Sequence, residues 1–135
     1  MHSATPADGA IPICASEVLT EGGKGWRFPV SAGGTPSTGF AVRYDGRVVA
    51  YLNRCAHVPI ELDWNEGEFF ESSGLYLMCS THGALYEPDS GRCAGGPCRN
   101  GRLRPISVLE VDGQIFWQPD DYVKPLGVQP PSLNE

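Results

Sequence analysis

Two hairpins dominate the pattern of hydrophobic and polar positions along the chain. Each consists of two segments rich in β-branched and aromatic residues, separated by an Asp-Gly pair. The segments are 40–44 and 47–52 around Asp45-Gly46, and 108–111 and 114–117 around Asp112-Gly113. Asp-Gly suits the two positive φ values of a type I′ turn. The pattern therefore predicts two antiparallel hairpins.

Shorter apolar runs lie between the hairpins. Residues 75–78 and 84–87 read as strands, and Pro88-Asp89-Ser90-Gly91 follows them as a turn. The one candidate helix is a short turn within 60–68, with Leu62 and Trp64 facing inward. The chain has 135 residues, of which 41% are hydrophobic, 17 are Gly and 12 are Pro. So many turn residues leave little room for long helices, and we expect a single all-β domain.

The two ends differ from the middle of the chain. Residues 1–12 are small and polar, and residues 118–135 are rich in proline with little periodicity. We expect a loose N-terminus over 1–12, the folded domain over 13–117 and a proline-rich tail over 118–135.

Charge and cysteine content narrow the classes of partner. Ten basic against 16 acidic residues give a net charge of −6, which disfavours nucleic acid and anionic membrane surfaces. No secretory signal and no bilayer-spanning apolar run is recognisable, so we expect no membrane association and a cytoplasmic protein. Five cysteines are an odd number, and in a reducing compartment they favour metal ligation over a disulfide framework.

Two short boxes combine thiols and imidazoles. They are Cys55-Ala56-His57 and Cys79-Ser80-Thr81-His82-Gly83, separated by residues 58–78. Together they supply two sulfur and two nitrogen ligands. A Cys2His2 zinc site uses the same atoms, but zinc modules place both cysteines on one knuckle and both histidines on one helix. A [2Fe–2S] cluster with two cysteines on one iron and two histidines on the other fits loops that each carry one of each.

These boxes resemble the Rieske iron–sulfur family, whose pattern is Cys-x-His, a spacer, Cys-x-x-His-Gly and a third loop bearing proline. Gly95-Gly96-Pro97 matches that third loop. The resemblance implies an antiparallel β-sandwich with a small cluster-binding subdomain over about 53–105. It also implies a [2Fe–2S] cofactor, with Cys55 and Cys79 on the buried iron and His57 and His82 on the outer one.

The chain departs from the family members of cytochrome bc complexes, which add a disulfide between the cluster loops. The corresponding positions here are Ile60 and Thr81, so the chain is similar to the soluble ferredoxin-like members instead. A serine hydrogen bond to a bridging sulfide is also lost, because that position is Ala84. The position of a tyrosine that bonds a cysteine sulfur is kept as Tyr86, for which a plain packing role is equally open.

For several residues outside the boxes, the sequence allows more than one role. The spacer is acidic and has no Lys or Arg, so it is either a solvated loop or a docking surface for a basic partner. Four arginines, Arg92, Arg99, Arg102 and Arg104, either balance that charge or contact a partner. Cys14, Cys93 and Cys98 are expected to be small buried side chains, without a disulfide.

The function that follows is one-electron transfer between a reductase and a terminal oxygenase or oxidase, without enzyme activity of the chain itself. An oxygenase also needs a mononuclear iron on two histidines and a carboxylate. The sequence has three histidines, of which only His2 is outside the boxes. The alternatives are a structural or sensor protein with zinc or a redox-inert cluster, and a small subunit of a larger oxidoreductase.

Overall fold

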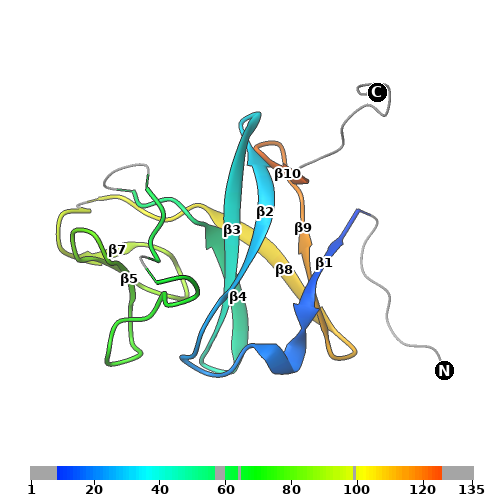
Figure 1. Ribbon diagram of the computed structural model, residues 1–135, viewed down its shortest axis with the longest axis horizontal. Coiled ribbons are helices and arrows are strands. Elements are labelled where there is room, and N and C mark those ends of the chain that lie inside the picture. The colour runs from blue at the N-terminus through cyan, green and yellow to red at the C-terminus, as the bar shows by residue number, and fades with distance from the viewer. Residues whose placement is uncertain (1–8, 57–59, 64, 99, 126–135) are drawn as a thin grey trace.

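The computed structural model describes residues 9–56, 60–63, 65–98 and 100–125, and these form ten strands and one short 3-10 helix (Figure 1). Seven strands make an antiparallel sheet, in the spatial order β1 (Ile11–Ala15), β9 (Gln114–Gln118), β8 (Pro105–Val111), β4 (Arg47–Leu52), β3 (Thr35–Tyr44), β2 (Trp26–Ala32) and β10 (Val123–Pro125). A second antiparallel sheet has the order β5 (Leu77–Cys79), β6 (Ala84–Tyr86) and β7 (Cys93–Gly95). The 3-10 helix η1 is Ser16–Val18. The all-β prediction is confirmed.

Both predicted hairpins form with the expected turns. Asp45 and Gly46 have φ values of 53° and 76° between β3 and β4, and Asp112 and Gly113 have 51° and 80° between β8 and β9. The residues flanking each pair face one another across the ladder. Positive φ at both central positions is the type I′ requirement, so local turn chemistry sets the register of both hairpins.

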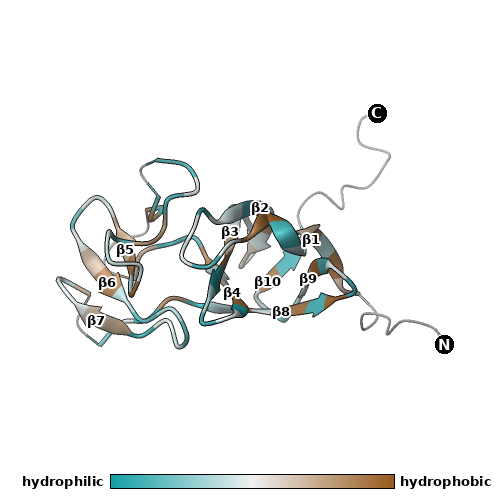
Figure 2. Cartoon of the chain, turned by 90° about the horizontal axis from the view of Figure 1, so that it is seen from below, coloured by the Kyte–Doolittle hydropathy of each residue, from teal (hydrophilic) through white to brown (hydrophobic). Residues whose placement is uncertain are grey.

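Two hydrophobic cores lie at the two ends of the molecule. Figure 2 shows the three-stranded sheet at one end and the β1–β9 pair at the other, with β3 and β4 between them. The core of the large sheet includes Phe28 and Trp117, whose rings are 5.5 Å apart. The second core lies beneath the small sheet, where Phe40 and Phe69 stack at 3.9 Å. Strand β3 therefore contributes to both cores.

Three sequence-based expectations need correction. Residues 60–63 and 65–68 contain no helix, because side chains take up their backbone N–H groups: Leu62 donates to Asn53 Oδ1 and Gly67 to Asp63 Oδ2. Leu62 is buried as expected, and Trp64 lies outside the described residues. The domain extends beyond residue 117, because β10 pairs with β2. Strand β3 begins at Thr35, earlier than the predicted residue 40.

Membrane-spanning helices are not found in the described part of the chain.

Candidate metal centre

Strand ends position the two cysteine-bearing loops. Cys55 follows the end of β4 by three residues, and its N–H donates to the carbonyl of Ile60 at 2.8 Å. Cys79 is the last residue of β5, and the N–H of Gly83 donates to its carbonyl at 2.8 Å. Gly83 has φ +76°, which lets the chain turn directly into β6. A backbone hydrogen bond between nearby residues therefore holds each of the two loops in place.

The two thiols lie together in the interior. Cys55 is 3% exposed and Cys79 is fully buried, and their side chains are within hydrogen-bonding reach of each other. Burial raises the pKa of Cys79, while the backbone N–H groups of Thr81 and His82 donate to its sulfur and lower that pKa. These donors would stabilise a thiolate in an otherwise apolar surrounding.

The histidine of the second box lies on the surface. His82 is exposed, on the turn between β5 and β6. His57, the histidine predicted for the first box, lies outside the described residues. The structure therefore brings together Cys55 and Cys79 and places His82 at the solvent side of the same loops.

Tyr86 connects the first box to the small sheet. Its hydroxyl oxygen accepts the backbone N–H of Ala56 at 2.9 Å and lies 3.2 Å from Cys55 Sγ. Because the oxygen accepts from Ala56, its own proton is available for the sulfur. Burial, followed by the contact with Cys55, raises the pKa of Tyr86 well above its usual range. Tyr86 therefore makes the contact with sulfur in addition to packing in the second core.

A buried polar network fixes the spacer against the large sheet. The Asn53 amide donates to Asp63 Oδ1 at 2.9 Å, and the Asp63 side chain is fully buried. Arg27 on β2 bonds both carboxylate oxygens of Glu61 at 2.8 Å, and its Nε lies 3.7 Å from Asp63. It also lies 3.9 Å from Glu66. No local pattern predicts this contact, since Arg27 is remote from the spacer in the chain.

Arg92, Arg102 and Arg104 form no ion pair with the described residues of the spacer, where Arg27 supplies the ion pairs. Arg104 pairs with Asp120 at 3.4 Å and lies over the ring of Tyr122. Arg102 donates to the carbonyl of Ser90 at 3.0 Å. Arg99 lies outside the described residues. A role in balancing the acidic spacer is therefore not seen for the three described arginines.

The third loop is closed by a disulfide. Cys93 and Cys98 are bonded, with Cα atoms 5.6 Å apart. The expectation of two unlinked cysteines is wrong, because the chain turns back after β7 and brings Cys98 beside Cys93, the first residue of that strand. Cys14 is a buried thiol, as predicted, and burial raises its pKa.

The described donor set contains both sulfur and nitrogen ligands. Two adjoining buried thiols with an imidazole at the surface match a two-iron cluster, in which the sulfur ligands serve one iron and the nitrogen ligands the other. The described residues fit such a cluster.

The family profile described as "Rieske [2Fe-2S] domain" matches residues 9–118. The chain belongs to the Rieske [2Fe–2S] domain family. The cofactor of this family is the [2Fe–2S] cluster. No curated protein sequence matches the chain.

Solved structures share the fold of this Rieske domain. One is the ferredoxin of carbazole 1,9a-dioxygenase from Nocardioides aromaticivorans IC177, at 21% identity and a TM-score of 0.66, covering 84% of this chain and 100% of that one. Another is the terminal oxygenase of the same system, at 20% identity and a TM-score of 0.64. The match to it covers 95% of this chain and 35% of the oxygenase, so the chain spans about a third of that protein.

Proposed function

We propose that this Rieske domain is a one-electron carrier between a reductase and an oxygenase or another redox enzyme, and not a catalyst. The observation that carries the proposal is the arrangement of two adjoining buried thiols beneath an exposed histidine. When bound, a [2Fe–2S] cluster accepts and releases one electron at a time. The surface position of His82 supports electron exchange with a partner at that side of the loops.

We assign the ligands by position. Cys55 and Cys79 would hold the inner iron, and His57 and His82 would hold the outer one. The backbone N–H groups of Thr81 and His82 and the Tyr86 hydroxyl surround the sulfur atoms with donors. Donors to sulfur favour the more negative, reduced state, so these groups set the reduction potential.

The similar structures favour a reductase-to-oxygenase position for the carrier. Among them is a complex of reduced oxygenase and oxidized ferredoxin in carbazole 1,9a-dioxygenase, matched over 82% of this chain and 93% of that one, at 19% identity and a TM-score of 0.63. A second candidate, the Rieske domain of an oxygenase, is favoured by the terminal-oxygenase match. That function needs a mononuclear iron on two further histidines, and these 135 residues offer only His2 beyond the boxes.

EPR of the dithionite-reduced protein tests the proposal. We expect a rhombic signal with a low average g-value, which Cys79→Ser abolishes. Cys14→Ser is the matched control, because Cys14 is also a buried thiol but lies on β1 in the core of the large sheet. A folded protein that retains its metal but gives no signal would overturn the proposal and favour zinc with a structural role.

A further inference from the structure

The Cys93–Cys98 disulfide closes a loop that lies against the second box. Residue Gly96, inside this loop, has φ +80°. A Cβ atom there would be 2.8 Å from the Gly83 carbonyl oxygen and 3.1 Å from Ala84 Cα. Gly83 directly follows His82, so the backbone of the closed loop packs on the turn that carries this histidine.

Gly101, which follows the closed loop and is hydrogen-bonded to both of its cysteines, lies against the first box. The N–H of Gly101 donates to the Cys98 carbonyl at 2.7 Å, and the N–H of Cys93 donates to the Gly101 carbonyl at 2.9 Å. A Cβ atom on Gly101 would be 2.9 Å from Ala56 Cβ. Ala56 directly follows Cys55. Gly96 and Gly101, on the two sides of Cys98, therefore lie against the two ligand-bearing loops.

We propose that the Cys93–Cys98 disulfide is a clasp that holds this segment against both cluster loops, which makes the two cysteines positioning residues for the cluster. The inference rests on the proposed function, because it concerns the same metal centre. The disulfide lowers the conformational entropy of the opened segment. For so short a loop, this loss favours the closed segment over the open one by about thirtyfold. Opening exposes the cluster loops to water and to chelators.

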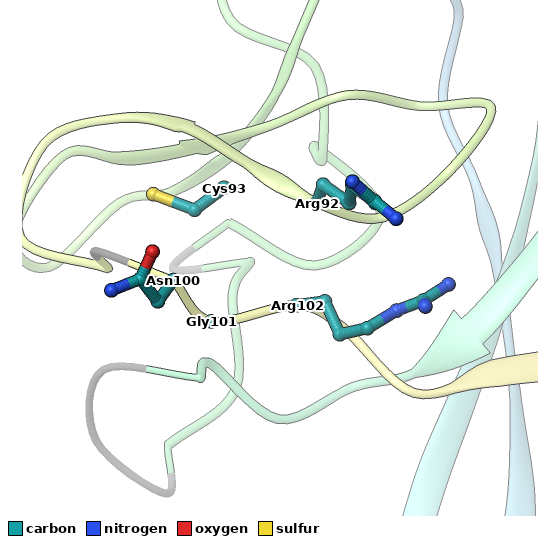
Figure 3. A pocket seen from close by; sticks show the side chains of 5 residues that line it. All are labelled: Arg92, Cys93, Asn100, Gly101 and Arg102. Carbon is teal, nitrogen blue, oxygen red and sulfur yellow. The ribbon is translucent and has the colours of Figure 1, made fainter.

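A thiol reductant can reach the clasp from one side. Cys98 is 3% exposed, whereas Cys93 is half-buried and lines a surface pocket of about 380 Å³ with Arg92, Asn100, Gly101 and Arg102 (Figure 3). Arg92 and Arg102 pair across a β-bridge at this pocket and give it a positive charge.

Reduction by a dithiol proceeds by two exchanges. One thiolate of the reductant attacks Cys93 Sγ, the disulfide bond breaks, and Cys98 leaves as a thiolate that takes up a proton. The second thiolate of the reductant then displaces Cys93, which is also protonated. The dithiol supplies both electrons and both protons and ends as a disulfide. In a reducing compartment, this reaction would release the clasp.

The test compares cluster loss in the iron-loaded wild type, the Cys93→Ser/Cys98→Ser double variant and the Cys14→Ser control. We expect the double variant to lose its visible absorbance to an iron chelator about thirtyfold faster than the wild type. Its midpoint potential should rise, because water entering the loosened site stabilises the more negative reduced cluster. Cys14→Ser should match the wild type in both respects. Equal rates and potentials in all three proteins would overturn the clasp.

A second measurement does not depend on folding of the double variant. The wild type is treated with a dithiol and then reoxidised, and alkylation with mass spectrometry counts the thiols at each stage. Cluster loss should accelerate on reduction and return to its starting rate on reoxidation. Alkylation of Cys93 and Cys98 in aerobically purified protein whose cluster signal is present would show free thiols there and would contradict the clasp alone. Absence of that signal from the wild type would refute the proposed function.

Discussion

Replacing Tyr86 by Phe removes one hydroxyl and leaves the ring in place. The hydroxyl lies 3.2 Å from Cys55 Sγ and accepts the Ala56 N–H at 2.9 Å, and Tyr86 is fully buried. Water therefore does not take over either hydrogen bond. Because the lost donor stabilises the more negative state, we expect the reduction potential of Tyr86→Phe to fall.

The size of the shift follows from the strength of this hydrogen bond. A hydrogen bond to a charged group contributes about 1.5–3 kcal/mol. We take about half of it to differ between the two oxidation states, which gives about 0.75–1.5 kcal/mol. One decade of a one-electron equilibrium is about 59 mV, so the expected fall is about 30–65 mV. Potentiometric titration followed by EPR measures it.

Tyr51→Phe is the matched control. Tyr51 belongs to the same buried core, its hydroxyl donates to the Pro88 carbonyl at 2.6 Å, and burial raises its pKa to about 12. Each substitution removes one buried hydroxyl and should cost about 1 kcal/mol of unfolding free energy. Only Tyr86→Phe should change the potential. An unchanged potential for Tyr86→Phe, or equal shifts in both variants, would refute the reasoning.

Two further predictions concern stability. Asp63→Ala should lower the free energy of unfolding in urea by about 3 kcal/mol, because it leaves buried donors without an acceptor. Glu66→Ala removes an 80% exposed side chain and should change this free energy by less than about 0.5 kcal/mol. Equal losses of unfolding free energy in the two variants would contradict this prediction. Hydrogen bonding by Arg43 lowers the pKa of Glu110, so this pair stabilises the fold above the ordinary value of 4.5 and loses its effect as the pH falls below it. At pH 7 the Glu110→Gln variant should therefore have a lower unfolding temperature than the wild type, and at pH 3 the two unfolding temperatures should be nearly equal. A difference in unfolding temperature that does not change with pH would contradict this role of the ion pair.

Local chemistry explains what could be predicted from the sequence. The Asp-Gly turns carry their conformation in two adjacent residues, so Asp45-Gly46 and Asp112-Gly113 predicted both hairpins and their register. The two cysteine boxes could be recognised in the same way, because the ligand residues of each box are only a few positions apart. The structure brings the Cys55 and Cys79 thiols together, as that pattern required.

Contacts between distant segments could not be predicted in the same way. Arg27 reaches Glu61 across 34 positions of sequence, and nothing near Arg27 marks it as a partner. The helical pattern within 60–68 was overridden by Asn53, whose side chain accepts the Leu62 N–H. The Cys93–Cys98 pairing depends on the path of the loop between them, which spacing alone does not determine.

The topology places the residues that stabilise the large sheet and the residues that set the reduction potential of the metal centre in different parts of the chain. The chain leaves the large sheet at the end of β4 and returns at the start of β8, and these strands are neighbours, with Ala50 opposite Ile106. The cluster subdomain is thus an insertion between two adjacent strands, which the sheet can accommodate without a change in register. Groups that touch the sulfur atoms, such as Tyr86, lie within the insertion, whereas Arg27 anchors it from the sheet. The Tyr86→Phe substitution, which keeps the buried ring, should therefore change the potential at a cost of only about 1 kcal/mol in stability. Substitutions at Arg27 should instead lower stability and leave the potential unchanged.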